Sequence, residues 1–297
     1  MEPRIWILKT ILLLLSLSAC ARARLPEPEI TDLVANADRP PKATQPTFDS
    51  QDQVVDQEYA VIWVQAGEKL ALRQPAGISG IVVENLDWKM REIELTGNTT
   101  LLGSSLWVEV VSTDEDGGWV NSWNLTEAVS QSDFCADSRV IELLTTFRRL
   151  IEAKEYVNLY KLINPDRGLS FRLNWYSPDI NVSREMVIDL FNNLEPIEWG
   201  TMADSGLSVV GPFQEVIYPK LIDVILQSPE YTCNQLQSGN TANEPIWPDE
   251  FVNLNFYGAY RPAINGNDFD WRTWAIGIEY VQGVPFISVM IHYSSEL

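Results

Sequence analysis

The residues that could perform acid–base chemistry are carboxylates that lie beside tryptophans in the C-terminal half of the chain. Glu198 precedes Trp199, Asp204 follows five residues after that tryptophan, and Asp270 precedes Trp271. Two carboxylates about 5–10 Å apart can cleave a glycosidic bond. The chain holds 41 acidic residues, however, so their presence alone is weak evidence, and Asp204 within Ala-Asp-Ser-Gly is also typical of a turn. A glycan hydrolase is therefore an alternative and not the leading interpretation.

The remaining residues do not favour a nucleophilic or metal-dependent enzyme. The chain has a single histidine, so a Cys–His pair would have to combine His292 with Cys135 or Cys233. Neither cysteine lies in a small-residue turn that opens a helix, where a lowered thiol pKa is expected. No His-x-x-x-His or Cys-x-x-Cys spacing indicates a zinc site. We therefore expect no catalytic residue, no metal and no cofactor.

His292 belongs to an alternating run that is typical of a strand. Alternation places Ile287, Val289 and Ile291 on one face, and Ser288, Met290 and His292 on the other. If the second face lines an opening, His292 could form a ligand-binding polar cluster with Asp270 and Arg272. The alternative is a half-buried histidine bonded to a neighbour.

The N-terminal residues have the parts of a secretory leader. Arg4 and Lys9 supply basic charge, residues 11–15 form an apolar core, and small residues precede Cys20. The pattern Leu17-Ser18-Ala19-Cys20 resembles the lipobox of bacterial lipoproteins. This resemblance implies a signal peptide over residues 1–19, cleavage before Cys20, lipid attachment to Cys20 and anchoring in a membrane of the cell envelope. The alternative is an ordinary cleaved signal with a chance cysteine.

Two cysteines remain once Cys20 is assigned to the lipid. In an oxidising compartment Cys135 and Cys233 could form a disulfide that closes a loop of roughly 100 residues. The alternative is two buried free thiols.

Charge and composition indicate an exported, folded protein behind a linker. The formal net charge is −20, which argues against nucleic acid because binding to phosphates relies on Lys and Arg. Residues 20–57 are rich in proline, acids and small polar residues, and we expect a disordered linker there.

Residues 58–130 contain short apolar runs about 10 residues apart, which predict a small all-β barrel or sandwich. The stretch resembles a bacterial SH3-like domain in four segments: Leu72–Gly77, Trp107–Val110, Gly118–Val120 and Asn124–Thr126. Such domains bind cell-wall or peptide ligands, so the resemblance implies a ligand of this kind. Trp107 and Trp119 occupy positions that are often core, and we expect Trp123 to be the exposed tryptophan that stacks on a ligand.

From residue 136 to the C-terminus, helices alternate with strands, which predicts an α+β domain. Apolar residues between Val140 and Ile151 follow helical spacing, with Asp137 or Ser138 as the cap. A short second helix is expected over residues 157–163, another over 184–192, and Pro219 should kink or split a helix that follows Pro212. Val281-Gln282-Gly283 predicts a hairpin between the last two strands.

This half also resembles an uncharacterised family of bacterial envelope domains. The residues that carry the likeness are Gly168–Phe171, Trp199-Gly200, Asp204–Gly206, Asp270–Arg272 and Ile291-His292. The resemblance implies a cone in which a helix pair packs against a curved antiparallel sheet, as in cystatin or nuclear-transport-factor folds. It implies no reaction.

Together these patterns predict a non-catalytic lipoprotein that binds cell-wall material, such as peptidoglycan, or an envelope protein partner. The alternatives are an acid-residue cell-wall hydrolase and a scaffolding subunit that binds a small ligand. Candidate ligand-binding residues are Trp123, Asp204, Asp270, Arg272 and His292.

Overall fold

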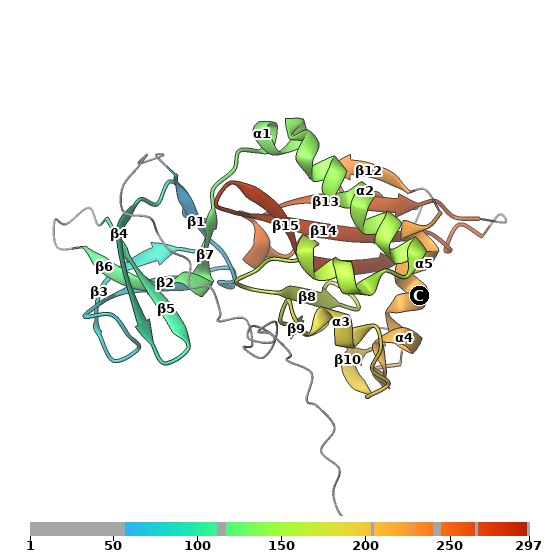
Figure 1. The fold of residues 1–297 in the computed structure, drawn as a ribbon, viewed down its shortest axis with the longest axis horizontal. Coiled ribbons are helices and arrows are strands. Elements are labelled where there is room, and N and C mark those ends of the chain that lie inside the picture. Colours follow the sequence, from blue (N-terminus) through green and yellow to red (C-terminus); the bar gives the residue numbers. More distant parts are fainter. Residues whose placement is uncertain are drawn as a thin grey trace, which may run out of the picture. The chain divides into compact units, whose positions relative to one another are not determined.

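The short apolar runs of the N-terminal half form strands, and the helical spacing that starts near Asp137 forms a helix packed on a second sheet (Figure 1). The computed structural model describes residues 57–111, 117–202, 205–227, 229–239, 245–264 and 267–295. These residues belong to one compact unit, Ser50–Leu297. The structure is mixed, with mostly strands, few helices and open sheets. The predicted boundary between residues 130 and 136 stays a prediction, and the signal, Cys20 and nearly all of the predicted linker lie outside the described residues.

The N-terminal half is built around a five-stranded antiparallel sheet in the order β3-β2-β6-β5-β4, accompanied by a β1–β7 pair. The strands are β1 (Tyr59–Val61), β2 (Lys69–Gln74), β3 (Ile81–Asp87), β4 (Leu95–Leu102), β5 (Ser105–Val110), β6 (Gly118–Asn121) and β7 (Leu125–Glu127). Their inward residues form a small apolar core that includes Leu72, Val108 and Val120. Gly118 is required at its position because a Cβ there would lie 2.8 Å from the Leu72 side chain.

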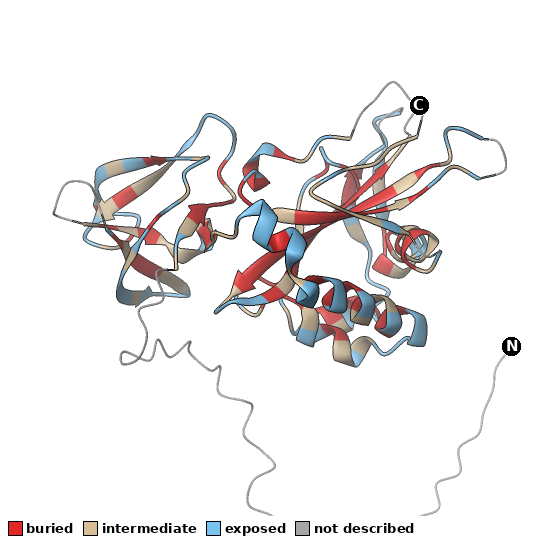
Figure 2. Cartoon of the chain, turned by 90° about the horizontal axis from the view of Figure 1, so that it is seen from above, coloured by how far each residue is buried: buried red, intermediate tan, exposed pale blue. Residues whose placement is uncertain are grey.

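The long helix α2 (Ser138–Ala153) forms as its apolar spacing predicts. All six stripe residues are buried: Val140, Leu143, Leu144, Phe147, Leu150 and Ile151 (Figure 2). The Asp137 side chain caps the helix by accepting from the Arg139 amide at 2.9 Å. The chain then turns through Lys154 in the left-handed region and continues as a 3-10 helix, η2 (Tyr156–Leu162), where a second helix was predicted.

Helices α2 and α5 (Tyr218–Ile225) cover one face of a six-stranded sheet in the order β12-β13-β14-β15-β8-β9 (Figure 1). The strands are β8 (Leu169–Arg172), β9 (Ile180–Val182), β12 (Glu230–Cys233), β13 (Asn255–Arg261), β14 (Arg272–Val281) and β15 (Val284–Ser294). All neighbours run antiparallel except β15 and β8. The opposite face packs on a separate cluster to which Ile62, from the N-terminal half, contributes.

The segment between β9 and β12 contains short elements. They are α3 (Val187–Leu190), β10 (Ile197–Thr201), β11 (Ser208–Gly211) and α4 (Phe213–Val216), followed by α5. Helices α4 and α5 are separate, and Pro219 lies in the first turn of α5, which confirms the predicted split because proline cannot donate within a helix. The helix predicted over residues 184–192 is only the four residues of α3.

The hairpin between β14 and β15 confirms one prediction and corrects another. Gln282 and Gly283 both have positive φ, as a two-residue turn requires. Gly277 pairs with Val289 and Ile278 pairs with Ile287, so Ser288 is the extra residue of a bulge. The prediction that Ile287 shares a face with Val289 and Ile291 was wrong, because the bulge turns Ile287 into the helix-covered core.

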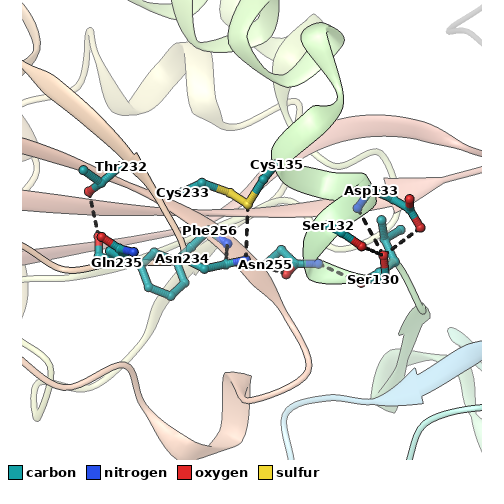
Figure 3. Close-up of a disulfide and its surroundings, with 11 residues drawn as sticks. Ser130, Ser132, Asp133, Cys135, Thr232, Cys233, Asn234, Gln235, Asn255 and Phe256 are labelled. Atoms are coloured by element: carbon teal, nitrogen blue, oxygen red, sulfur yellow. Dashed lines mark hydrogen bonds between the residues drawn. A yellow bond between two sulfur atoms is a disulfide. The ribbon is translucent and has the colours of Figure 1, made fainter.

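Cys135 and Cys233 form a disulfide that joins the helix α1 (Gln131–Ala136) to the end of β12 (Figure 3). Asn234 supports the junction, because its side chain accepts from the Phe256 amide and donates to Asn255 Oδ1, both at 2.9 Å. The bridge spans 98 residues of sequence. It therefore ties the segment before α2 to the outermost strand of the sheet.

Removing this bridge should destabilise the fold. In the chain-entropy account, a cross-link over a loop of this length restricts the unfolded chain by about 4–5 kcal/mol. We expect reduction to lower the free energy of unfolding by roughly that amount, measured by denaturant titration. A Cys135→Ser/Cys233→Ser variant is the control, since its unfolding should not respond to reductant. An equal response in both proteins would contradict the prediction.

Candidate binding site around Trp123

Trp123 lies in a 3-10 turn, η1 (Ser122–Asn124), that connects β6 to β7. The Asn121 side chain caps this turn by accepting from the Trp123 amide at 3.0 Å. Trp123 is 40% exposed whereas Trp107 is 5% exposed, in line with the exposures expected from the sequence. Trp119 is half-buried. The turn thus presents an indole ring on a backbone that its own hydrogen bonds hold.

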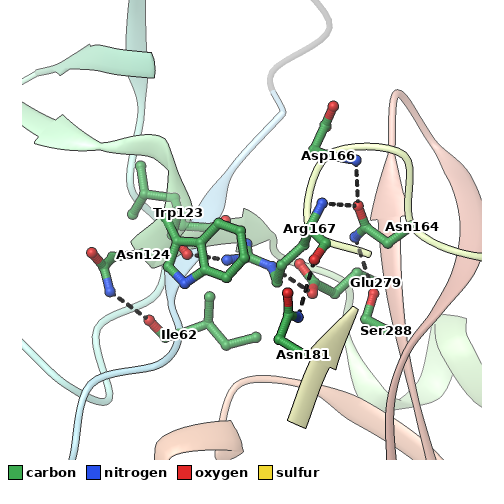
Figure 4. Close-up of polar contacts among 10 residues, drawn as sticks. Ile62, Trp123, Asn124, Asn164, Asp166, Arg167, Asn181, Glu279 and Ser288 are labelled. Carbon is green, nitrogen blue, oxygen red and sulfur yellow. Dashed lines mark hydrogen bonds and ion pairs between the residues drawn. The ribbon is translucent and has the colours of Figure 1, made fainter. Parts of the chain in front are cut away.

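The Arg167 guanidinium supports this turn (Figure 4). It donates to the carbonyl oxygens of Trp123 and, at 2.9 Å, of Leu125. It also pairs with Glu279 on β14 at 2.9 Å, and both side chains are almost fully buried. Its charged carbon lies 4.9 Å from the Trp123 ring centroid, within the range of a cation–π contact. One buried cation therefore fixes both the backbone and the ring of Trp123.

Asn164 holds Arg167 in this position (Figure 4). Its side-chain oxygen accepts from the amides of Asp166 and Arg167 at 2.9 and 3.0 Å. Its amide nitrogen donates to Ser288 Oγ, the bulged residue of β15, at 3.0 Å. The bulge thus helps to place the arginine loop.

A second tryptophan continues the aromatic surface. The Trp63 ring lies 6.4 Å from that of Trp123 and 4.7 Å, edge to face, from that of Phe251. Trp63 has positive φ, which is uncommon for a residue of this size. We call Trp123, Trp63 and Phe251 the aromatic strip. Trp123 is its exposed member, Trp63 is half-buried and Phe251 is buried.

Arg172 closes the other end of the strip. Its guanidinium lies 4.9 Å from the Phe251 ring centroid and pairs with Asp179 and Glu250, each at 2.6 Å. It also donates to the Trp175 carbonyl at 3.2 Å. Trp175 is itself exposed and packs edge to face on Tyr176. The three rings of the strip therefore have a carboxylate-paired guanidinium group at each end, Arg167 beside Trp123 and Arg172 beside Phe251.

Two further carboxylates, Glu127 and Asp166, lie close enough to Glu279 to interact with it electrostatically. Burial raises the pKa of Glu127 above its ordinary 4.5, and the negative charges of Asp166 and Glu279 add to the rise. The amides of Gly283 and Gln282 oppose the rise because they donate hydrogen bonds to the carboxylate. Burial also raises the pKa of Asp166. The Glu127 oxygens accept from Gln282 at 2.5 Å and from Gly283 at 3.0 Å. Glu127 therefore holds the β14–β15 turn.

The structure brings two of the predicted site residues together at the other end of β14. Asp270 Oδ1 lies 3.2 Å from a guanidinium nitrogen of Arg272 and 3.2 Å from one of Arg261. Arg261 also pairs with Asp223 of α5 at 3.2 Å. Arg261, which was not among the residues predicted from the sequence, lies directly opposite Arg272 in the β13–β14 register. Whether this ion-paired cluster binds a ligand stays a prediction.

His292 lies in the core beside this cluster. It is 1% exposed, with its ring centroid 5.1 Å from that of Trp274. Burial and then the positive charges of Lys220, Arg272 and Arg261 lower the pKa of His292 well below 6.5, while the backbone of Leu173 opposes the shift. The Leu173 contact falls short of hydrogen-bond geometry, and neither ring nitrogen has a partner within the described residues. His292 is more deeply buried than the half-buried alternative expected.

Two further sequence-based predictions find no structural test. Asp204 and Cys20 lie outside the described residues. Over the described ranges, no group of three or more His, Cys, Asp or Glu residues is arranged to hold a metal ion.

Comparison with known proteins adds no assignment. The chain matches no protein-family model, no curated protein and no solved structure.

Removing Arg167 should leave Glu279 buried and unpaired, so we expect Arg167→Met to lower the free energy of unfolding by about 3–5 kcal/mol. Replacing both partners, in Arg167→Met/Glu279→Leu, should restore much of the loss because no lone charge remains. Denaturant titration measures both. Arg149→Met is the control, since its ion pair with Glu155 is exposed, and such pairs contribute at most about 1 kcal/mol. A double variant as unstable as Arg167→Met would contradict this account.

The raised pKa of Glu127 predicts a pH dependence of stability. The folded chain keeps the Glu127 proton to higher pH than the unfolded chain. The stabilisation that this proton gives to the folded state is therefore fully present below pH 4.5 and is lost as pH rises through the folded pKa. Glu127→Gln should therefore flatten the decline of the unfolding free energy above pH 4.5. Denaturant titrations at several pH values test this, with the exposed Glu142→Gln as control. Equal slopes in wild type and Glu127→Gln would count against it.

Proposed function

We propose that this chain is a non-catalytic, membrane-anchored lipoprotein of the bacterial cell envelope that binds cell-wall material through the aromatic strip around Trp123. The leader and Cys20 support the anchor, which is expected to be a lipid on the cysteine. None of the helices in the described part of the chain combines the length and apolar character that a membrane crossing needs. Export into an oxidising compartment also agrees with the Cys135–Cys233 disulfide.

The finer architecture belongs to the same proposal. The five-stranded antiparallel sheet with its β1–β7 pair supports an SH3-like barrel over residues 58–130. The six-stranded sheet with α2 and η2 on one face supports a cone, similar to cystatin or nuclear-transport-factor folds, over residues 136–297. Contacts such as the Arg167–Leu125 hydrogen bond join the two parts.

The exposed indole of Trp123 on a fixed backbone carries the proposal. An aromatic face offers a large apolar surface for a sugar ring or a peptide proline at little cost in conformational entropy. Arg167 and Arg172 are already paired with carboxylates, so they add little attraction for charged groups. We therefore expect stacking to dominate binding, and raised salt to weaken it little.

Peptidoglycan pelleting tests the proposal. The chain from Leu25 to Leu297, which keeps the whole compact unit, should co-sediment with purified peptidoglycan. Trp123→Ala should reduce affinity roughly tenfold, because an aromatic anchor is among the costliest contacts to lose. Trp123→Phe should retain most of the binding, and Tyr160→Ala, which removes an exposed ring from η2, serves as the control. Equal pelleting of wild type and Trp123→Ala would reject the strip as the site.

The same experiment separates the alternatives. Soluble fragments released from the peptidoglycan, and lost in Asp204→Asn or Asp270→Asn, would favour the hydrolase. Absence of both pelleting and cleavage would exclude the wall as ligand and favour an envelope protein or a small ligand at the same surface.

A further inference from the structure

Two hairpin tips of the N-terminal sheet expose large aliphatic side chains. The turn between β2 and β3 carries Ile78, which is 85% exposed, and Ile81 at its end is 76% exposed. The turn between β4 and β5 follows Leu101 and Leu102, which are 56% and 42% exposed. We call these four residues the apolar tip. Side chains of this size are seldom left so exposed together without an interaction that covers them.

The two hairpins lie side by side. A Cβ built on Gly77 would lie 3.0 Å from Leu102 Cδ1, so the first turn contacts the second. The first turn is also held in shape, since the Gly80 amide donates to the Gly77 carbonyl at 3.0 Å. Arg73 donates to the Gly80 carbonyl at 2.9 Å. The apolar tip is therefore a single feature with a supported backbone.

The stretches around the two hairpin turns lack acidic residues. The chain has 41 acidic residues, yet residues 70–83 and residues 95–108 contain none. Arg73 is the only charged residue in the two stretches. A lipid surface disfavours carboxylates, because they lose hydration near acyl chains and are repelled by anionic headgroups. The absence of acidic residues around the two turns is therefore compatible with contact between the apolar tip and lipid.

We infer that the apolar tip inserts into a lipid surface. A stable protein interface needs about 800 Å² from each partner, which four side chains at two turns cannot supply, and a second copy would also bring a like charge of −20. A bilayer has no such minimum area, because each apolar group adds to insertion in proportion to its size. The tip then orients the N-terminal sheet against the membrane.

This inference goes beyond the proposed wall binding and uses different residues. It relies on the lipid anchor only for local concentration, since a tethered chain meets the bilayer far more often than a free one. An experiment with unlipidated protein therefore tests the tip alone.

The first test is a fluorescent probe on the tip. In the chain from Leu25 to Leu297, Cys135 and Cys233 are bridged, so Ile78→Cys gives a single reactive thiol for an environment-sensitive dye. On addition of phosphatidylcholine vesicles the emission should shift to the blue, and brominated lipids should quench it. Val157→Cys, on exposed η2, should show neither effect. An unchanged Ile78→Cys spectrum at saturating lipid would overturn the inference.

Vesicle flotation provides the second test. Ile78→Ser/Leu102→Ser should reduce the fraction of protein that floats with phosphatidylcholine vesicles by tenfold or more, since each lost apolar group weakens insertion (about tenfold per 1.4 kcal/mol). Both side chains are exposed, so thermal unfolding should be unchanged. Peptidoglycan pelleting of the variant should also be unchanged. This distinguishes loss of vesicle binding at the apolar tip from loss of wall binding at Trp123. Equal flotation of wild type and variant, or self-association of the wild type that the variant abolishes, would overturn the inference.

Discussion

The arrangement of the two halves depends on the hydrogen bonds and the ion pair that the buried Arg167 guanidinium forms. It binds two carbonyl oxygens of the N-terminal half, those of Trp123 and Leu125, and a carboxylate of the C-terminal sheet, that of Glu279. A cation with so little exposure is tolerated only when its donors are satisfied. The carbonyls of Trp123 and Leu125 therefore depend on Arg167 for hydrogen bonds, and Arg167 depends on these carbonyls to satisfy its donors.

Apolar packing also joins the two halves. Ile62, which directly follows β1, enters the core on the second face of the six-stranded sheet, beside Phe251 and Trp271. Asn253 donates to the Val61 carbonyl at 2.8 Å and the Trp63 amide donates to the Glu250 carbonyl at 3.0 Å, so backbone groups on both sides of Ile62 are satisfied. Shared core and shared hydrogen bonds explain why residues 50–297 behave as one compact unit although the sequence divides them into two patterns.

Local patterns in the sequence were sufficient for the elements but not for the site. The stripe of α2, the split at Pro219 and the turn at Gln282-Gly283 depend on neighbours within a few residues, and each was predicted. The bulge at Ser288, the burial of His292 and the role of Arg167 depend on contacts with residues far along the chain; Glu279 is 112 positions from Arg167. Nothing in the spacing around Arg167 or Trp63 marks them, because their partners are set by the fold. Trp123 was predicted to be exposed because Trp107 and Trp119 occupy positions of the resemblance that are often core.

The parallel pairing of β15 with β8 has a consequence for the order in which the protein can fold. Val289, Met290 and Ile291 pair with Ser170, Phe171 and Arg172, so β8 and β9 join the sheet only through β15, which follows them by about 100 residues. A polypeptide is synthesised from its N-terminus to its C-terminus. A strand whose partner lies far along the chain therefore stays unpaired until that partner has been synthesised. Residues 169–182 must therefore remain unpaired with their final neighbour until residues 284–294 have been made. The half with local hairpins can fold early, and the C-terminal half closes as a late, cooperative step.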